Sequence, residues 1–223
     1  ECIVKGDPPT AETRRDGIDF QSPGGNLGRW LRPNLESFPG RQSYLVAEED
    51  RQGRLRENYL SDGESLLVGL AWVSKNKRIG AQKSMTLMEL APLTGIPGVR
   101  FIDLQYGDTA EERRQFEDHT GVTVLHDEHV DQMSDLDAFA AQVAAMDLVI
   151  SVSNTTVHMS GALGVPTWVM LNTVPLPCWL LERDDNPWYP SVRLFRQPAG
   201  GGWANVTERI GEALRAFAGG GSR

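Results

Sequence analysis

The segment from Asp147 to Leu171 constrains the fold of this chain more than any other. Its first part, 148–152, is apolar except for Ser151, which predicts a strand buried on both faces, as is typical of a parallel sheet. A short polar turn, 153–156, then leads into a predicted helix, and a Gly-Val-Pro turn leads out of it into a second apolar strand. The segment therefore predicts a strand–helix–strand unit of an α/β protein.

The start of this predicted helix is a candidate anion site, because Ser153, Asn154, Thr155 and Thr156 supply hydroxyls and a helix cap. Unpaired N–H groups and a partial positive charge at a helix N-terminus attract phosphate. The same positive charge lowers the affinity of a nearby imidazole for its proton. We therefore expect His158 to be neutral and either to donate to a phosphate oxygen or to act as a base. The alternative is a packed structural histidine.

Composition narrows the class of ligand. The chain has 223 residues and a net charge of −8, which argues against nucleic acid as the main partner but allows one anionic ligand at a local cluster. No apolar run approaches the ~18 residues that span a bilayer, and no secretory signal is visible. Cys2 and Cys178 are far apart and lack metal-site spacing, so we expect a cytoplasmic protein without a metal or cofactor.

Strands and helices alternate from Leu66 onward. This alternation predicts a doubly wound, mostly parallel Rossmann-like sheet over residues 61–218. Residues 1–40 are polar and rich in Gly and Pro and are expected to be irregular, as is a Pro-rich stretch before the last helix, and 219–223 look like a disordered tail. The predicted strands are 66–73, 99–105, 122–125, 148–152 and 167–171, and the predicted helices are 48–60, 85–92, 109–119, 134–146 and 204–217.

Ligands of such sheets bind beyond the carboxyl ends of the strands, so the loops there hold the candidate site residues. The loop after the first strand carries four cations in an otherwise acidic chain, and they could neutralise a diphosphate: Lys75, Lys77, Arg78 and Lys83. The alternative is a solvated loop. Lys83 and Ser84 are expected to precede a helix, where Ser84 would be the N-cap.

Two further loops carry polar side chains. Gln105 and Tyr106 can donate hydrogen bonds to a ligand, although a capped turn explains them equally well. His126 and Asp127 are candidates to line a pocket near a ribose or base. A metal site at 126–129 is disfavoured because a third ligand at a diagnostic offset is missing. The sequence also lacks a Gly-x-Gly-x-x-Gly fingerprint, a P-loop and a Gly-x-Ser-x-Gly elbow, which disfavours dinucleotide oxidoreductases, NTPases and serine hydrolases.

Segment 147–171 resembles the donor-binding motif of GT-B glycosyltransferases. The nearest likeness is to the glycosyltransferase-like domain of bacterial tetratricopeptide-repeat proteins. ADP-heptose:lipopolysaccharide heptosyltransferases and O-GlcNAc transferase resemble the chain more distantly. Segment 186–197 is similar to a second stretch of the bacterial group, and 68–74, 83–84 and 99–107 form a third point of likeness. Together these motifs cover roughly residues 66–218.

The resemblance implies one half of a two-domain enzyme that holds a sugar nucleotide in its cleft. Residues 61–218 would be the C-terminal, donor-binding half, and residues 1–60 a remnant of the acceptor domain with a linker. Thr155 and Thr156, with their backbone N–H groups, would hold the diphosphate, and Lys83 and Lys75 would offset its charge. The nucleoside would lie near His126 and Asp127, and His158 would lie near the donor.

The expected activity is transfer of a glycosyl group from a nucleotide-diphosphate sugar, without a metal, because 135–137 fits a helix start better than a chelating Asp-x-Asp. The sequence specifies neither the acceptor, glycan or protein, nor the catalytic base. Two alternatives stay open. Asn154, where the family often has Asp, and the short N-terminal part favour a non-catalytic binding or scaffold module. An epimerase of the related two-domain type needs acids in both domains, which 223 residues barely allow.

Overall fold

The computed structural model describes residues 23, 26–60 and 65–220, and divides the chain into two compact units that meet between Pro39 and Gly40. In the first unit, the described elements are helix α1, Leu27–Leu31, and the 3-10 helix η3, Leu35–Ser37. The predictions for residues 1–22, for a helix stop at 61–63 and for a tail at 221–223 lie outside the described residues.

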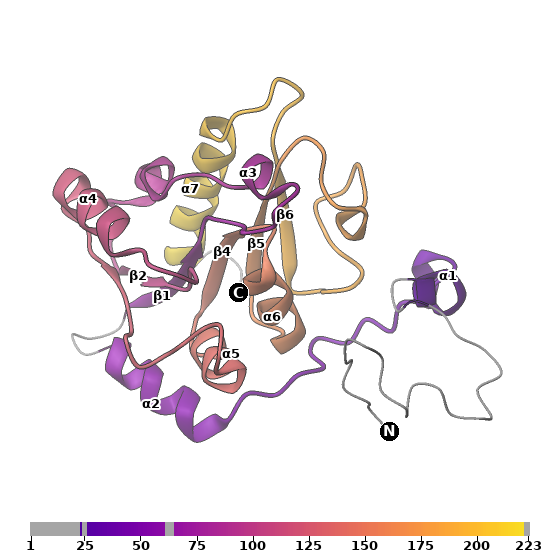
Figure 1. Cartoon of the computed structure of the whole chain (residues 1–223), viewed down its shortest axis with the longest axis horizontal. Coiled ribbons are helices and arrows are strands. Elements are labelled where there is room, and N and C mark those ends of the chain that lie inside the picture. The colour runs from indigo at the N-terminus through magenta and orange to yellow at the C-terminus, as the bar shows by residue number, and fades with distance from the viewer. Residues whose placement is uncertain (1–22, 24–25, 61–64, 221–223) are drawn as a thin grey trace. The chain divides into compact units, whose positions relative to one another are not determined.

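The second unit is built on a six-stranded sheet with the order β3-β2-β1-β4-β5-β6, in which every neighbouring pair of strands is parallel (Figure 1). This order and direction confirm the predicted doubly wound Rossmann-like fold. The strands are β1, Leu66–Ala71; β2, Val99–Asp103; β3, Val124–Leu125; β4, Leu148–Val152; β5, Thr167–Leu171; and β6, Val192–Arg196.

Strand β6 lies inside the stretch that was expected to be irregular, so that expectation is wrong for residues 192–196. Its residues alternate between the faces of the sheet: Val192 and Leu194 are buried with the residues of β5, whereas Arg193 is exposed. Phe195 packs on the opposite face against Trp168, with ring centroids 5.5 Å apart. An edge strand of five residues after a Pro-rich loop gives a weak signal in the sequence, because two of its five residues, Arg193 and Arg196, are charged.

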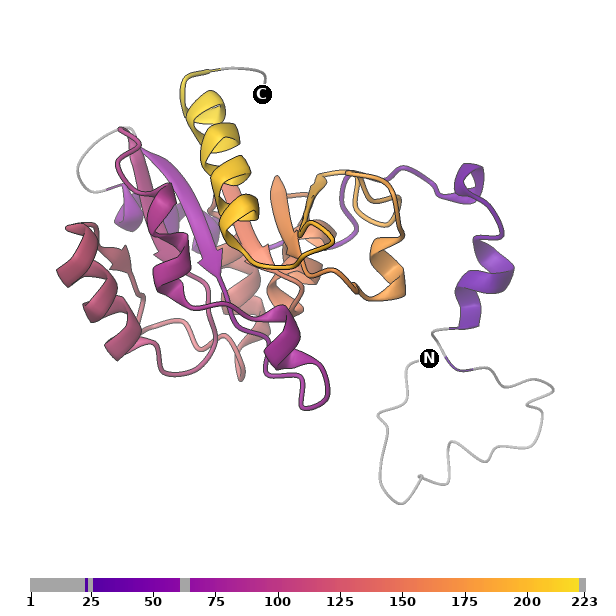
Figure 2. The same cartoon turned by 90° about the horizontal axis from the view of Figure 1, so that it is seen from above.

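Helices cover both faces of the sheet (Figure 2). The first face packs against α4, Ala110–Thr120, the 3-10 helix η4, Leu87–Leu93, and α7, Ala204–Ala218, drawn in yellow. The other face packs against α2, Glu49–Tyr59, α5, Leu136–Ala144, and α6, Thr155–Leu163. Within the described part of the chain, no helix is both long and apolar enough to cross a bilayer.

Helix α2 belongs to the α/β unit rather than to the preceding segment. Its Leu55 and Tyr59 are buried in the same apolar cluster as Leu67 and Phe139, and α2 packs along α5. Arg56 also pairs with Asp147 at 2.9 Å. The compact unit thus begins at Gly40, ahead of the predicted boundary at residue 61. The origin of residues 1–60 as part of an acceptor domain stays a prediction.

The loop after β1 contains a short helix, α3, Gly80–Lys83, which was not predicted. Ser84 ends this helix instead of beginning the next one, so the N-cap prediction for Ser84 is wrong. Its hydroxyl accepts a hydrogen bond from the Ser74 N–H at 2.9 Å and donates to the Gly80 carbonyl at 2.8 Å. Thr86 begins η4 and forms a capping box with Glu89.

Candidate functional site

A pocket of about 500 Å³ opens at the carboxyl edge of the sheet, where the loops after β1, β2 and β4 meet. β1 and β4 are neighbours at the centre of the sheet, and the strand order runs outward from them in opposite directions. This is the switch point at which doubly wound folds bind ligands. The lining residues are Ser74, Lys75, Asn76, Lys83, Tyr106, Gln132, Met133, Leu136, Phe139, Ser153, Asn154, Thr155, His158 and Leu176.

Most of the residues predicted from the sequence meet in this pocket. The lining includes Lys75, Lys83, Tyr106, Ser153, Asn154, Thr155 and His158. Six other predicted residues do not line it: Lys77 and Arg78 on the surface, and Gln105, Thr156, His126 and Asp127. The predicted site residues therefore divide into those that line one pocket and those that do not contact it.

Asn154 caps helix α6 and fixes the geometry of the loop after β4. Its Oδ1 accepts hydrogen bonds from the Thr156 N–H at 3.0 Å and the Ser151 hydroxyl at 3.1 Å. Its Nδ2 donates to the Val73 carbonyl at 3.2 Å and so joins the ends of β1 and β4. The Thr156 amide predicted to hold a phosphate is therefore already engaged, and its side chain is fully buried, whereas Thr155 is exposed at the pocket.

Replacing Asn154 with alanine is expected to lower the free energy of unfolding by about 1–2 kcal/mol, the usual cost of a lost N-cap. Urea denaturation of both proteins measures the difference. The matched control is Asn26→Ala, because Asn26 is the N-cap residue of α1 but its side chain makes no cap hydrogen bond. A loss at Asn26 equal to that at Asn154 would contradict the capping role.

Lys83 supplies a nearly buried cation to the pocket. Its side chain is 5% exposed, and its Nζ donates a hydrogen bond to the Ser153 carbonyl at 2.7 Å. Burial lowers the pKa of this amine, because a charged group loses its hydration there. Within the described ranges, no carboxylate lies within ion-pair distance of Lys83, and the pocket lining contains no acidic residue.

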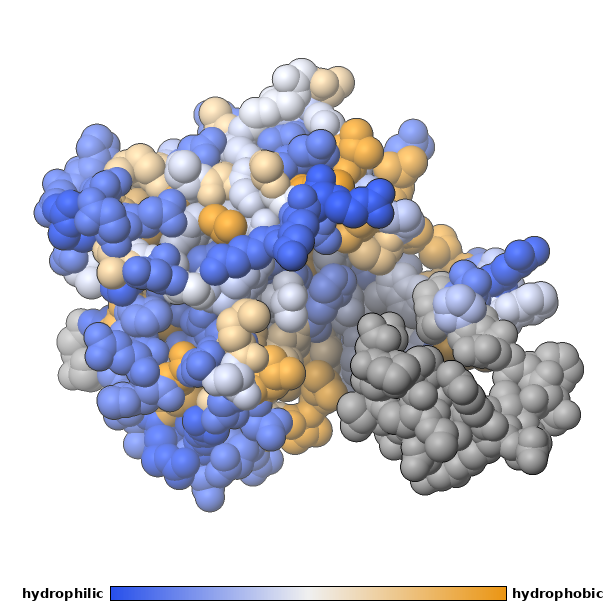
Figure 3. Space-filling model, viewed as in Figure 1, coloured by the Kyte–Doolittle hydropathy of each residue, from blue (hydrophilic) through white to orange (hydrophobic). Residues whose placement is uncertain are grey.

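The predicted cationic loop divides between the pocket and the surface. Lys75 lines the pocket, with its Nζ 5.5 Å from the Tyr106 ring centroid, and its backbone N–H donates to the Tyr106 hydroxyl at 2.9 Å. Lys77 and Arg78 are exposed and lie outside the lining. Figure 3 shows strongly hydrophilic residues across the middle of this face, over the loop that leads to α3. The pocket and its rim are thus locally positive in a chain with a net charge of −8.

His158 is held by two aromatic side chains. Its Nδ1 lies 3.0 Å from the Tyr189 hydroxyl, and its ring stacks on Trp179 with centroids 5.4 Å apart and an angle of 17° between the planes. Burial and, to a smaller extent, the nearby charge of Lys83 lower the pKa of His158, so that the imidazole is neutral at pH 7. Trp179 in turn donates from Nε1 to the Ser153 hydroxyl at 2.8 Å.

Apolar side chains form another part of the pocket wall and were not predicted as site residues. Phe139 is buried, whereas Met133 and Leu136 are 70% and 55% exposed, and Leu176 is half-buried. In the sequence, the first three look like the apolar stripe of an ordinary amphipathic helix. Leu176 lies in the Pro-rich stretch, where the sequence has no periodic pattern that would predict a buried or pocket-lining side chain.

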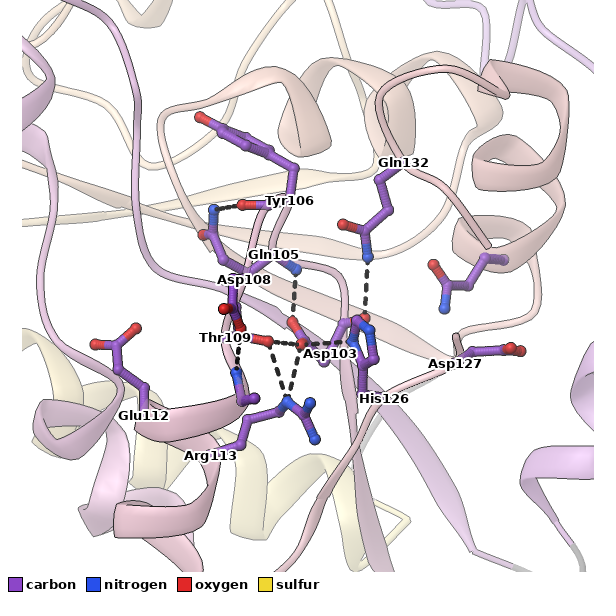
Figure 4. A network of polar contacts seen from close by, with 12 residues as sticks. Asp103, Gln105, Tyr106, Asp108, Thr109, Glu112, Arg113, His126, Asp127 and Gln132 are labelled. Atoms are coloured by element: carbon purple, nitrogen blue, oxygen red, sulfur yellow. Dashed lines mark hydrogen bonds and ion pairs between the residues drawn. The ribbon is translucent and has the colours of Figure 1, made fainter. Parts of the chain in front are cut away.

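Behind the pocket, Asp103 organises a buried polar network (Figure 4). Its carboxylate accepts from the Thr109 hydroxyl at 2.5 Å and lies 2.9 Å from His126 Nδ1 and 3.3 Å from Arg113 Nε. The Asp103 carbonyl also accepts from Gln132, which lines the pocket, at 3.4 Å. His126 therefore helps to hold the loop that carries part of the pocket wall.

Gln105 and Asp127 also make hydrogen bonds within the protein. Oε1 of Gln105 accepts from the backbone N–H groups of Trp72 and Val73 at 3.0 and 2.7 Å. Asp127 accepts a hydrogen bond from the Tyr59 hydroxyl at 2.7 Å. Burial and, to a smaller extent, this hydrogen bond raise the pKa of Tyr59. Their contact with a nucleoside stays a prediction. In the part of the chain that the structure describes, His, Cys, Asp and Glu side chains form no cluster of three that could hold a metal ion.

The chain is similar to a known protein in sequence and to solved structures in fold. No family model matches the chain. Protein FlbA of Caulobacter vibrioides is 34% identical over 207 residues, which are 91% of this chain and 34% of FlbA. The chain thus spans about a third of the length of this curated relative.

Two solved structures share the architecture of the α/β unit. ADP-heptose lipopolysaccharide heptosyltransferase II of E. coli aligns with a TM-score of 0.57 and 16% identity, over 78% of this chain and 53% of that one. A family 9 glycosyl transferase of Veillonella parvula aligns with a TM-score of 0.51 and 14% identity, over 77% and 45%. The unit therefore has a Rossmann-like fold that matches part of GT-B glycosyltransferases.

Proposed function

We propose that this domain binds a nucleotide-diphosphate sugar and is the donor-binding part of a glycosyltransferase. The observation that carries the proposal is Lys83, a nearly buried cation without a carboxylate partner in the described structure, at a pocket beside the N-terminus of α6. A buried charge is costly unless it is paired. A ligand that brings negative charge to Lys83 recovers this cost, and the diphosphate of a nucleotide sugar brings two negative charges spread over several oxygens.

The geometry favours an extended anion over a single carboxylate. Lys83 and Lys75 both line the pocket, and Thr155 presents the first turn of α6 to it. A helix N-terminus and two amines together provide a diffuse positive region, suited to several phosphate oxygens. In glycosyl transfer, negative charge grows on the leaving diphosphate, and preorganised cations and N–H groups stabilise it without a metal.

The apolar wall suits the rest of the donor. Nucleobases are flat and stack on apolar surface, and Met133, Leu136 and Phe139 provide such a surface in the same pocket. The structural neighbour of E. coli has ADP-heptose in its name, and we carry to this chain only the chemical class, a sugar on a nucleoside diphosphate. The acceptor, a link to tetratricopeptide repeats and the likeness to O-GlcNAc transferase stay predictions from the sequence.

Calorimetry with ADP, GDP, UDP and CDP tests the donor site. At least one nucleoside diphosphate is expected to bind below millimolar concentration, and its monophosphate is expected to bind about tenfold more weakly because one phosphate group is lost, a difference of about 1.4 kcal/mol. Circular dichroism and a thermal melt show that the protein is folded. A folded protein that binds none of the four at millimolar concentration would contradict the proposal.

A non-catalytic binding module is the second candidate function. The observation that favours it is the absence of an acidic residue among the described residues that line the pocket, since a carboxylate often serves as the base in glycosyl transfer. Incubation with radiolabelled nucleotide sugars separates the two functions. If the protein releases the sugar and the His158→Gln variant releases less of it, the result supports an enzyme. Tight binding without any release of sugar would support the non-catalytic module.

A further inference from the structure

Lys75 lies alongside Tyr106 at the edge of the pocket. Its backbone N–H donates to the Tyr106 hydroxyl at 2.9 Å, whereas its Nζ lies over the Tyr106 ring, 5.5 Å from the centroid. The Nζ also lies against Gly107, because a Cβ atom added to this glycine would collide with it. The lysine side chain therefore runs along the tyrosine from its hydroxyl to its backbone, and both residues line the pocket.

The turn after β2 is fixed against the end of β1. Gln105 is buried, and its Oε1 accepts from the N–H groups of Trp72 and Val73 at 3.0 and 2.7 Å. Its Nε2 donates to the Tyr106 carbonyl at 3.1 Å (Figure 4). Gly107 has a φ of +94°, a conformation in which residues with a side chain are strained. Tyr106 and Gly107 thus form a fixed surface for the lysine.

The Lys75 ammonium lies on a ring face and a glycine, not on a carboxylate. Within the described ranges, no Asp or Glu lies within ion-pair distance of Lys75. The face of an aromatic ring attracts a cation and takes up none of its conventional hydrogen bonds. A carboxylate would also hold the ammonium, but it would cancel the charge that attracts an anionic ligand. The arrangement therefore orders the side chain and leaves its charge for a ligand.

We propose that Tyr106 and Gly107 are positioning residues that hold the Lys75 ammonium at the pocket, so that an anionic ligand meets two ordered cations, Lys75 and Lys83. The inference rests on the proposed function for the nature of this ligand, a diphosphate. Ordering a free lysine side chain on binding costs conformational entropy, and a side chain that is already ordered avoids part of this cost. Tyr106 and Gly107 therefore raise the affinity through Lys75.

Spectra of ¹³C-labelled lysine side chains test the position of Lys75 without any ligand. The Cε protons of Lys75 are expected upfield of their random-coil position, because the end of the side chain lies over the Tyr106 ring. Tyr106→Leu is expected to return them to that position. Lys75→Arg assigns the signal by removing it, and the exposed Lys77 of the same loop is the control, with an unshifted signal in both proteins. A random-coil position of Lys75 in the wild type would overturn the inference.

Calorimetry with inorganic pyrophosphate tests the effect on affinity. Lys75→Met is expected to weaken binding about tenfold, and Tyr106→Leu about two- to fivefold, the factor that corresponds to a cation–π contact at an exposed site. In the Lys75→Met background, Tyr106→Leu is expected to have no further effect, because Tyr106 acts through the lysine. Equal losses in both backgrounds would show that Tyr106 acts independently of Lys75, which contradicts the positioning role.

A pair of glycine variants keeps the test decisive if Tyr106→Leu is poorly folded. Gly107→Ala is expected to displace the Lys75 Nζ, which weakens pyrophosphate binding and shifts the Lys75 signal. Gly121→Ala is the matched control, because Gly121 also has a positive φ, +70°, but an added Cβ meets none of the described residues beyond its chain neighbours within 4 Å. Both variants are expected to lose similar stability through backbone strain. Equal pyrophosphate affinities in the two variants would overturn the role of Gly107.

The ligand-free spectra separate this inference from the proposed function. If the Lys75 signal responds to Tyr106→Leu and Gly107→Ala but neither pyrophosphate nor a nucleoside diphosphate binds, the position of Lys75 stands and the proposed ligand fails. The same double-mutant comparison is made with the nucleoside diphosphate that binds. If that ligand binds but loses equal affinity on Tyr106→Leu with and without Lys75, the donor site stands and the positioning role fails.

Discussion

Lys83→Met is expected to weaken the binding of a nucleoside diphosphate by about 10- to 100-fold and to leave the fold intact. Hydrogen bonds to charged groups are worth about 1.5–3 kcal/mol each, and each 1.4 kcal/mol is a factor of ten in affinity. The methionine side chain has a similar length and fills the same space. Because it removes a buried charge that has no carboxylate partner among the described residues, the free protein is expected to be as stable as the wild type or more stable.

This opposite response of affinity and stability distinguishes a ligand-binding lysine from a structural one. Calorimetry gives the affinity, and urea denaturation without ligand gives the free energy of unfolding. Lys77→Met is the matched control, because Lys77 belongs to the same loop and carries the same charge but is exposed outside the pocket lining. Its effect on affinity is expected to be several-fold smaller and to vanish at high salt. Equal losses at the two lysines would show that only the overall charge of the loop matters.

The sequence predicts the central sheet because three of its inner strands, β1, β4 and β5, consist mostly of apolar residues. All five residues of β4 and of β5 are buried, and such runs are visible without any knowledge of tertiary contacts. Edge strand β6 is different, since it pairs with β5 alone and two of its five residues, Arg193 and Arg196, are charged. Local patterns therefore reveal the apolar strands of this sheet more readily than edge strand β6.

The candidate site, like the sheet, could be predicted only where the local sequence pattern carries the signal. Residues directly after β1 and β4 were predicted because the carboxyl edge of a parallel sheet is the usual place for ligands. Lys83 and the Ser153 carbonyl are far apart in sequence, and nothing local predicts that one would be buried against the other. Gln105 and His126 were expected at the ligand, yet their side chains complete backbone and carboxylate hydrogen bonds behind the pocket wall. Whether a polar side chain faces a pocket or the backbone depends on tertiary packing.

The irregular segment between β5 and β6 contributes more to the site than its sequence suggested. It carries the 3-10 helix η5, Pro177–Trp179, and its Leu176, Trp179 and Tyr189 line or support the pocket. Pro residues and the lack of periodicity hide this role, because each contact is made to a different element. Trp179 is nevertheless buried in one apolar cluster with residues of β5 and β6, and Leu176, Cys178 and Tyr189 pack against it. The segment is therefore part of the folded unit and not a loose connection.

Trp179→Ala is expected to lower the free energy of unfolding by about 3–5 kcal/mol, the usual cost of removing a large buried aromatic side chain. The Trp179 side chain is fully buried, stacks on His158 and donates to the Ser153 hydroxyl. Its loss leaves a cavity beneath the start of α6 and removes the ring on which the His158 imidazole stacks. We therefore expect weaker binding of nucleotide sugars as well as a lower midpoint of urea denaturation.

Trp188→Ala is the matched control, since Trp188 lies in the same segment and is 41% exposed. A partly exposed side chain recovers less transfer free energy on folding, so the loss is expected to stay below about 2 kcal/mol. The comparison decides whether the segment between β5 and β6 is anchored through Trp179 or held by many equal contacts. A small loss at Trp179, similar to that at Trp188, would show that the segment detaches from the sheet without disturbing the core. In that case His158 would depend on Tyr189 alone for its orientation.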